Sequence, residues 1–288
     1  MISSPHGAGV APNLEISDAD FLLTARLIRD RFGIHLTDGK RAMVASRLYR
    51  AIRELGFESY HEFAVAMLTS PTQDTLSLLV DCISTNHTFF YREPEHFLLL
   101  RDEVLPSILA HQRQGRERDL RLWCAASSTG EEPYALAMVI HEVLGAEYGQ
   151  WQAGLLATDI SQGALQKAER AVYPTEAVAS LPPAWQTRYF DPQPGGNSVI
   201  KAFLRKEVTF RRFNLMNATF PFKQPFHAIF CRNVMIYFED DTRRALIDRM
   251  ADALMPGGWF FVGHAETISG LTSRFRNVCP GVYRKEGR

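Results

Sequence analysis

The stretch that decides the fold is RLWCAASSTGEEPYALAMVI, residues 121–140. It begins as a short apolar strand, passes through a small polar loop, and becomes a helix opened by Pro133, a residue well suited to the first helical position. Strand–loop–helix units of this kind usually hold a phosphate and are rich in glycine. This loop has one glycine and two adjacent carboxylates, Glu131 and Glu132, which would repel a phosphate. The stretch therefore predicts a different ligand.

The composition describes an ordinary globular protein and excludes several classes. Lys+Arg and Asp+Glu both number 32 among the 288 residues, so no overall field attracts nucleic acid or an anionic membrane. The four cysteines are far apart and form no CxxC pair, which indicates reduced thiols, and we expect neither a zinc site nor a disulfide framework. No apolar run approaches the roughly 20 residues of a membrane span, and the first 13 residues resemble a flexible tail and not a signal peptide. We expect a soluble cytoplasmic protein.

The hydrophobic pattern divides the chain into two regimes. Residues 14–85 have a helical period, with Ser17 as a plausible N-cap and Gly33 as a stop signal, so we expect an all-helical domain. From about residue 120, strand-like and helical runs alternate, which predicts an α/β fold with a parallel sheet. A segment at about 174–212 interrupts the alternation and is expected to form an inserted β-subdomain. The last apolar residues, 275–285, predict a hairpin return.

A second acidic residue helps to define the ligand. In open α/β sheets the ligand lies outside the carboxyl ends of the strands, where a carboxylate such as Asp159 commonly accepts hydrogen bonds from ribose hydroxyls. Carboxylates at the first loop suit a cationic amino-acid end. Together these features fit S-adenosylmethionine. Each residue also has a simpler explanation, because acids stabilise helix starts through the helix dipole and Asp159 could cap the next helix.

Further motifs connect the chain to a known family. They are STNHTFFYREPEHF (84–97), STGEEPY (128–134), FNLMN (213–217), AIFCRNVMIYF (228–238) and GHAE (263–266). With them the chain, from Leu14 onward, resembles the chemotaxis-receptor glutamate methyltransferases of the CheR family. The resemblance implies a Rossmann-like class I S-adenosylmethionine-dependent methyltransferase domain over 97–288, mostly parallel with an antiparallel C-terminal strand. It also implies that a linker over 86–96 contributes to the cofactor site.

The resemblance assigns site residues by position. The cofactor-binding positions are Asn86, Thr88, Arg92, Glu132, Asp159, Asn214, Leu215, Arg232 and Asn233. Among these, the family's pattern implies that Glu132 receives the cofactor's amino group, that Asp159 holds the ribose and that Asn214 and Leu215 lie beside the adenine. Arg92 and Tyr237 match the residues nearest the donor methyl group and are the catalytic candidates. Structural alternatives remain: Tyr237 as a core aromatic, Asn233 as a turn former, and Arg92 in an ion pair between domains.

The implied reaction is methylation of glutamate side chains on the cytoplasmic domains of bacterial chemoreceptors, which yields methyl esters for sensory adaptation and S-adenosylhomocysteine as product. A glutamate carboxylate has a pKa near 4.3, so it is already the nucleophile at neutral pH and needs no general base. The barrier is one of position, in a site with little water. Arg92 could align the incoming carboxylate or hold the cofactor's own carboxylate. We expect no metal.

The expected partner is an acidic helical receptor bundle. A candidate docking face on the helical domain comprises Lys40, Arg41, Arg47, Arg50 and Arg53. The last three recur every three residues and share one side of a helix, although a solvated helix face has the same pattern. The inserted segment is shorter than in family members that bind a receptor's C-terminal tether, so we expect no tether binding. We also expect a monomer that neither binds nucleic acid nor inserts into membranes.

Two other function classes share the cofactor fold. One is a methyltransferase for a small molecule or nucleic acid, although the N/D-P-P-Y run of amino-adenine methylases is missing from the sequence after residue 228. The other is a non-catalytic sensor that binds S-adenosylmethionine without turnover. A dehydrogenase is disfavoured because the loop lacks the G-x-G-x-x-G fingerprint.

Overall fold

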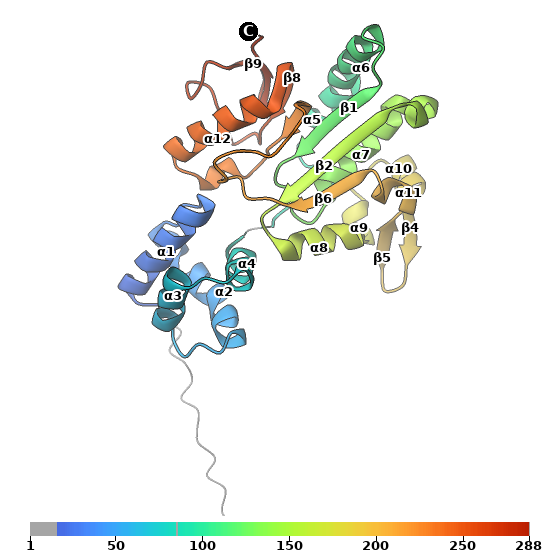
Figure 1. Ribbon diagram of the computed structural model, residues 1–288. Helices are drawn as coiled ribbons and strands as arrows, with labels where there is room; N and C mark the ends of the chain where they lie inside the picture. Colours follow the sequence, from blue (N-terminus) through green and yellow to red (C-terminus); the bar gives the residue numbers. More distant parts are fainter. Residues whose placement is uncertain (1–15, 85, 288) are drawn as a thin grey trace, which may run out of the picture. The chain divides into compact units, whose positions relative to one another are not determined.

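A computed structural model describes residues 16–84 and 86–287 of the chain (Figure 1). The chain forms two compact units, Met1–Ser84 and Thr85–Arg288. The expected tail over residues 1–13 lies outside the described residues. None of the described helices is both long and apolar enough to cross a bilayer.

The first unit is helical, as expected, and its helix ends follow the capping signals of the sequence. Its elements are α1 (Asp18–Phe32), η1 (Asp38–Lys40), α2 (Arg41–Glu54), α3 (Tyr60–Thr69) and α4 (Gln73–Ile83). The Ser17 hydroxyl accepts a hydrogen bond from the backbone N–H of Asp20 at 3.1 Å. Gly33 ends α1 in the left-handed conformation, with φ 72°. Both predicted signals are confirmed.

Helix packing in this unit follows the apolar stripe of α2. Val44, Leu48 and Ala51 are fully buried, and Ile52 is nearly so. They face α4, which packs against α2, while α3 packs against α1. The apolar residues of α2, which recur every three or four positions, therefore form the buried helix face that the sequence predicts.

The second unit is built on a seven-stranded sheet in the described residues, with the order β6-β2-β1-β7-β8-β10-β9. The strands are β1 (Asp119–Cys124), β2 (Gln152–Asp159), β6 (Val208–Arg212), β7 (Phe226–Phe230), β8 (Leu254–Phe261), β9 (Phe275–Cys279) and β10 (Val282–Lys285). The first five in this order run parallel, and β10 pairs antiparallel with both β8 and β9. The parallel sheet with an antiparallel C-terminal hairpin is confirmed.

A small antiparallel sheet interrupts the large one between β2 and β6. It has the order β3-β5-β4, with β3 (Val172–Pro174), β4 (Phe190–Gln193) and β5 (Asn197–Ile200). Short helices α9 (Thr175–Val178), α10 (Pro183–Tyr189) and α11 (Ala202–Arg205) accompany it (Figure 1). Residues 208–212, which the sequence pattern predicts as the end of the insert, form β6 instead. Val208 and Phe210 are buried and β6 pairs with β2, so burial in the large sheet decides their place.

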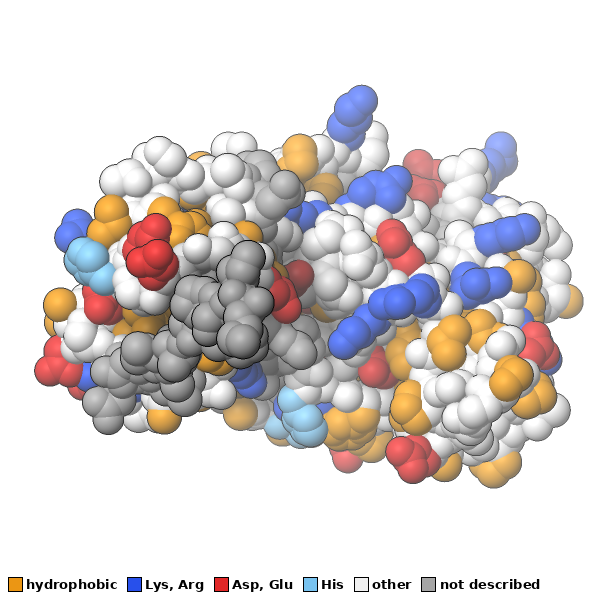
Figure 2. Space-filling view, turned by 90° about the horizontal axis from the view of Figure 1, so that it is seen from below, with side chains coloured by type: hydrophobic (Ala, Val, Ile, Leu, Met, Phe, Trp, Pro, Cys, Tyr) orange, Lys and Arg blue, Asp and Glu red, His pale blue; other side chains and the backbone are white. Residues whose placement is uncertain are grey.

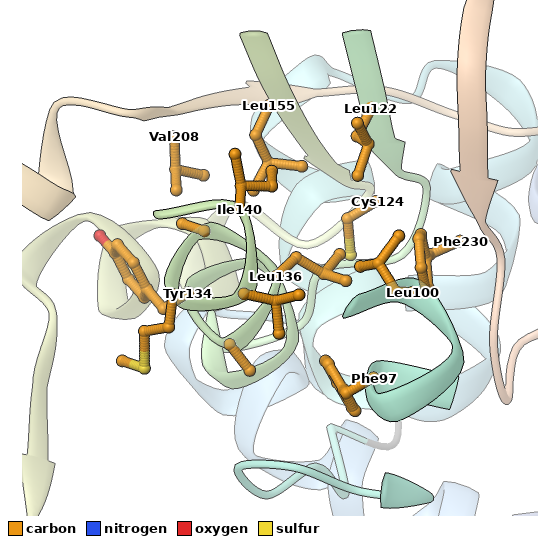
Figure 3. Packing of buried hydrophobic residues seen from close by; sticks show 14 of the residues in the cluster. Phe97, Leu100, Leu122, Cys124, Tyr134, Leu136, Ile140, Leu155, Val208 and Phe230 are labelled. Atoms are coloured by element: carbon orange, nitrogen blue, oxygen red, sulfur yellow. The ribbon is translucent and has the colours of Figure 1, made fainter. Parts of the chain in front are cut away.

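Helices cover the sheet and enclose one apolar core. They are α5 (Pro94–Leu99), the π-helical turn η2 (Leu100–Val104), α6 (Leu105–Gln114), α7 (Glu131–Leu144), η3 (Gly145–Gln150), α8 (Gln162–Arg170), η4 (Met235–Tyr237) and α12 (Asp240–Ala253). Figure 3 shows side chains of α5 and α7 meeting those of the strands, among them Phe97, Leu136 and Phe230. This core fixes the start of α7 against the ends of the strands, which is where the candidate site lies.

Candidate functional site at the carboxyl ends of the strands

The candidate site lies where the strand order reverses. From β1 the chain builds outward through β2 to β6, whereas β7 and β8 lie on the other side of β1. Cys124, the last residue of β1, pairs in register with Ala157 of β2 and Phe230 of β7. The loops after these three strands therefore emerge together, and such a switch point is the usual ligand crevice of open α/β sheets.

The loop after β1, residues 125–130, is tied to the end of β2. The Ser127 N–H donates to the Thr158 carbonyl at 2.9 Å, and the Ser128 N–H donates to the Asp159 carboxylate at 2.8 Å. Gly130 begins α7 with φ 101°, and a Cβ there would lie only 2.6 Å from the Tyr173 hydroxyl oxygen. The single glycine of the loop is therefore required by backbone conformation and by packing.

The two adjacent acids at the start of α7 lie in different surroundings. Glu131 accepts a hydrogen bond from the Thr129 hydroxyl at 2.7 Å, and burial raises the pKa of its carboxyl. Glu132 accepts hydrogen bonds from Arg232 at 2.5 Å and from the Cys124 thiol at 3.3 Å. Because neighbours on a helix point in different directions, only Glu132 faces the strand ends.

Arg232 joins three segments that are distant in sequence. Its side chain is fully buried and donates to Glu132, to the Glu93 carboxylate at 2.9 Å and to the Arg92 carbonyl at 2.5 Å. Two carboxylates thus share one guanidinium, which leaves one net negative charge in this group. A buried group of that charge favours a cationic ligand over an anionic one.

The ionisation of this group follows from its pairing. Burial raises the pKa of Glu93, but hydrogen bonding and charge from Arg232, with help from Asn233, lower it to about 2. Burial lowers the pKa of Arg232, while the charges of Glu132 and Glu93 raise it by more, so the guanidinium stays charged. Burial, reinforced by Glu132, raises the pKa of the Cys124 thiol. Cys124 is therefore a neutral hydrogen-bond donor and not a nucleophile.

The linker approaches this group through an unusual backbone. Tyr91 (φ 61°) and Glu93 (φ 57°) both lie in the left-handed region, which residues other than glycine seldom adopt and which concentrates at functional sites. The ring of Tyr91 stacks on Phe97 with 4.8 Å between centroids, and Glu93 pairs with Arg232. Between them, the Arg92 guanidinium donates a hydrogen bond to the His87 carbonyl at 2.9 Å. Its Cζ lies 5.8 Å from the centroid of the Phe89 ring. These contacts of Arg92 stay within the linker.

Asp159 closes β2 and organises its surroundings. Its two carboxylate oxygens accept the N–H groups of Ser128 and Ser161 at 2.8 and 2.9 Å, and only 9% of the residue is exposed. The N-cap of α8 is Ser161, whose hydroxyl accepts the Ala164 N–H at 3.0 Å. Asp159 therefore supports the start of α8 from two positions upstream of the cap.

The predicted pair Asn214 and Leu215 follows β6, next to the end of β2. The Phe213 N–H donates to the Asp159 carbonyl at 2.9 Å, which brings the two chain segments together. The Asn214 side-chain oxygen accepts the Met216 N–H at 2.9 Å, and Leu215 is buried. The loop after β6 thus turns tightly beside Asp159.

Asn233 and Tyr237 are placed by a carboxylate of the loop after β8. Glu266 accepts the N–H groups of Asn233 at 2.7 Å, Gly263 at 2.6 Å and Ile236 at 3.2 Å. Burial raises the pKa of Glu266, and these backbone donors oppose the rise only in part. Asn233 has φ 60° and its side chain donates to Glu93 at 3.3 Å. Tyr237 is half-buried in η4 and not part of the fully buried core.

The structure brings together some of the predicted residues and not others. Arg92, Glu132, Arg232 and Asn233 form one hydrogen-bonded group, while Asp159 is linked to it through the loop after β1. Asn86 is exposed and Thr88 half-buried, and no hydrogen bond or ion pair among the described residues joins either of them to the group.

The predicted docking face is only partly free. Arg41 is ion-paired with Asp18 and with Asp38 at 3.5 Å, and Arg47 donates to the carbonyls of Ile83 and Ser84 at 3.3 Å. Lys40 is half-buried and Arg53 exposed, and the side chain of Arg50 lies outside the described part. In the view of Figure 2, basic and acidic side chains are interspersed over the surface.

The structure adds Glu93 and Glu266 to the site, two residues to which the sequence motifs give no role. Both belong to motifs of the resemblance, Glu93 to the FYRE end of the linker and Glu266 to GHAE, so the motifs mark their positions without indicating what they do. The structure also gathers Glu93, His96 and His264, whose side-chain donor atoms lie within 4.8 Å of one another. The two histidines are far apart in the chain, and spacing alone could not reveal this cluster.

The residues at the strand ends fit S-adenosylmethionine. The hydroxyl groups of Ser127 and Ser128 are buried with no hydrogen-bond partner among the described residues, which leaves polar atoms available to a ligand in the loop after β1. The net negative charge beside them suits the ligand's cationic amino-acid end. Glu132 and Asp159 are the residues that would hold the amino group and the ribose.

Comparison with known proteins agrees with this arrangement. Residues 86–283 match the CheR methyltransferase S-adenosylmethionine-binding domain, and residues 19–84 match the CheR methyltransferase all-alpha domain. The chain is 37% identical over 265 residues to a chemotaxis protein methyltransferase of Escherichia coli, covering 91% of this chain and 89% of that one. It is 38% identical over 255 residues to chemotaxis protein methyltransferase 2 of Pseudomonas aeruginosa, covering 87% of each. A chemotaxis protein methyltransferase of Borreliella burgdorferi is 33% identical over 95% of this chain and 96% of its own. The chain belongs to the CheR methyltransferase family.

Proposed function

We propose that the protein transfers a methyl group from S-adenosylmethionine to glutamate side chains on the cytoplasmic helical domains of bacterial chemoreceptors. The observation that carries the proposal is the buried group of Glu93, Glu132 and Arg232, whose single excess negative charge lies at the switch point of the sheet. The names of the chemotaxis relatives support the choice of receptor as substrate.

S-adenosylmethionine supplies a methyl group on a positively charged sulfur. A glutamate oxygen forms a bond to the methyl carbon as the carbon–sulfur bond breaks, and that bond's electron pair remains on the sulfur. The negative carboxylate and the positive sulfonium are both neutralised, and no proton moves. A reaction that removes charge is favoured where water is excluded, so the chain's task is to bind, orient and desolvate.

The residues divide this task. Glu132 would hold the amino group, and Arg232 with Glu93 would fix the orientation of Glu132. Asp159, whose carboxylate is held in place by two backbone N–H donors, would accept hydrogen bonds from the ribose hydroxyls. Arg92 and Tyr237 would position the methyl group or the incoming carboxylate. Glu266 holds the backbone that carries Asn233 and η4, and it would act through Tyr237 without touching the substrate.

The test is transfer of labelled methyl from S-adenosylmethionine to purified cytoplasmic receptor fragments, followed by mild alkali. The expected result is label on the receptor that leaves as methanol under base, because carboxyl methyl esters are hydrolysed there. A receptor fragment with its acceptor glutamates replaced by alanine is the control. Stable label would contradict an ester, and cofactor binding without any transfer would favour the non-catalytic sensor.

A further inference from the structure

We propose that Glu93, His96 and His264 form a binding site for one divalent transition-metal ion of the zinc class. The three side chains each offer one ligand atom, and these atoms lie within 4.8 Å of one another. Two imidazoles and one carboxylate are the ligand types that zinc takes in sites with one open position. The site shares Glu93 with the group that carries the proposed function, but its test measures Zn²⁺ binding alone and does not depend on methyl transfer.

His96 has the hydrogen bonding of a metal ligand. Its Nε2 lies 3.2 Å from the Pro280 carbonyl, which can only accept, so Nε2 carries the proton and Nδ1 has a free lone pair. The residue is 1% exposed, and Nδ1 has no hydrogen-bond partner among the described residues. Ligating histidines typically donate their other ring N–H to a carbonyl in this way. An unpartnered buried nitrogen otherwise costs free energy.

The ring of His96 is also fixed in place. Gly281, with φ 72°, lies so close that a Cβ there would be 2.8 Å from His96 Nε2. The ring packs edge-on against Phe261 with 5.7 Å between centroids. A ligand that cannot rotate away binds with a smaller loss of conformational entropy.

The second ligand lies at the correct distance. His96 Nδ1 and Glu93 Oε2 are 3.5 Å apart. Two ligand atoms bound tetrahedrally at about 2.0–2.2 Å would be separated by roughly 3.4 Å. Glu93 keeps its other hydrogen bonds, to Arg232 and Asn233, which would serve as the outer shell that orients a ligating carboxylate.

The third ligand provides the entry path. His264 is exposed, its ring centroid is 4.8 Å from that of His96, and it belongs to the loop after β8. A metal ion bound by all three would connect that loop to the residues at the start of α5. Binding should therefore stabilise the folded chain, by an amount that grows with the logarithm of the metal concentration once the site is occupied.

The test uses the full chain and Zn²⁺ in isothermal titration calorimetry, with His264→Ala as the variant and His111→Ala, an exposed histidine of α6, as the matched control. We expect one saturable site in the parent and in His111→Ala, and binding at least about 100-fold weaker in His264→Ala, since loss of even an outer-shell partner costs 10–100-fold. Zn²⁺ should raise the thermal midpoint of the parent and of the control only.

A second variant reports ligation directly. In His264→Cys the site should bind Co²⁺ with a thiolate charge-transfer band in the near ultraviolet, because the thiolate replaces the imidazole. Absence of saturable Zn²⁺ binding by the parent would overturn the proposal, and so would equal affinity in His264→Ala and the parent. Co²⁺ binding to His264→Cys without the thiolate band would place the metal elsewhere and overturn it too.

Discussion

Arg232 and Glu132, which are 100 positions apart in the chain, meet at 2.5 Å between guanidinium and carboxylate. The contact joins the loop after β7 to the first turn of α7, and Glu93 extends it to the linker at 2.9 Å. One buried arginine therefore sets the position of two carboxylates.

Arg232→Met should destabilise the second unit strongly. It removes the fully buried partner of two carboxylates whose side chains are 14% exposed, and breaking a buried pair costs about 3–5 kcal/mol. Urea unfolding monitored by tryptophan fluorescence gives the free energy of unfolding. The matched control is Arg276→Met, because Arg276 pairs with Glu286 at 3.7 Å on the surface, with 65% and 52% of the side chains exposed. That change should cost about 0–1 kcal/mol. Equal losses in the two variants would contradict the account.

Stability should fall with acid in two separable ranges. Glu93 has a folded-state pKa of about 2, below its ordinary 4.5, so its contribution is complete above pH 4.5 and is lost as the pH falls toward 2. His96 and His227 have pKa values lowered to about 4, chiefly by burial, so the unfolded chain takes up protons first and stability falls between 6.5 and 4.

Glu93→Gln separates the two ranges. The variant should be less stable than the parent at pH 7 and should lose less stability between pH 4.5 and 2, because the titrating carboxylate is gone. Its loss between 6.5 and 4 should remain, as an internal reference. Urea unfolding at intervals of pH measures both slopes. A parent and variant with parallel profiles below pH 4.5 would show that Glu93 is not the group that titrates there.

Tyr237→Phe tests whether this tyrosine positions the reacting groups. The variant should lower the single-turnover rate of methyl transfer about 2- to 13-fold, the effect of losing one hydrogen bond of about 0.5–1.5 kcal/mol. Affinity for S-adenosylmethionine and the thermal midpoint should be retained. A lower midpoint with an unchanged rate would instead identify Tyr237 as a packing residue.

Arg53→Glu tests docking of the receptor. Arg53 is an exposed member of the predicted basic face. The KM for the receptor fragment should rise about 2- to 30-fold, because reversing the charge has about twice the effect of losing an exposed ion pair of about 0.2–1 kcal/mol, and the difference should shrink at high salt. Arg26→Glu, an exposed change on α1 of the same unit, is the control. A rise of equal size in the control would indicate a general effect of charge and no specific face.

Much of the fold could be predicted because local signals and tertiary packing agree. Ser17 and Gly33 mark the ends of α1, and the fourfold spacing of Val44 and Leu48 marks the buried face of α2. The end of the inserted segment could not be predicted in the same way. Residues 208–212 have a β-like pattern in the sequence, but only their pairing with β2 assigns them to the edge of the large sheet and not to the inserted subdomain.

The candidate site was predictable where one motif carries the residue and not where the role depends on contact. Glu131 and Glu132 are alike in sequence, and helix geometry separates them, since only Glu132 reaches Arg232. The basic face has no acidic residue within 39–53, yet Asp18 and Asp38 come to Arg41 from outside that stretch. Partners that are distant in sequence decide which charges are free.

The most direct test of the central claim compares the binding of S-adenosylmethionine to Glu132→Gln and to Glu131→Gln by isothermal titration calorimetry. Each variant loses one carboxylate from the first turn of α7 and keeps the size of the side chain. Glu132→Gln should weaken binding about 10- to 150-fold, the loss of one charged hydrogen bond of 1.5–3 kcal/mol. Glu131→Gln should bind as the parent does. Equal weakening in both variants, or none in Glu132→Gln, would contradict the claim that the charge at Glu132 receives the cationic end of the cofactor.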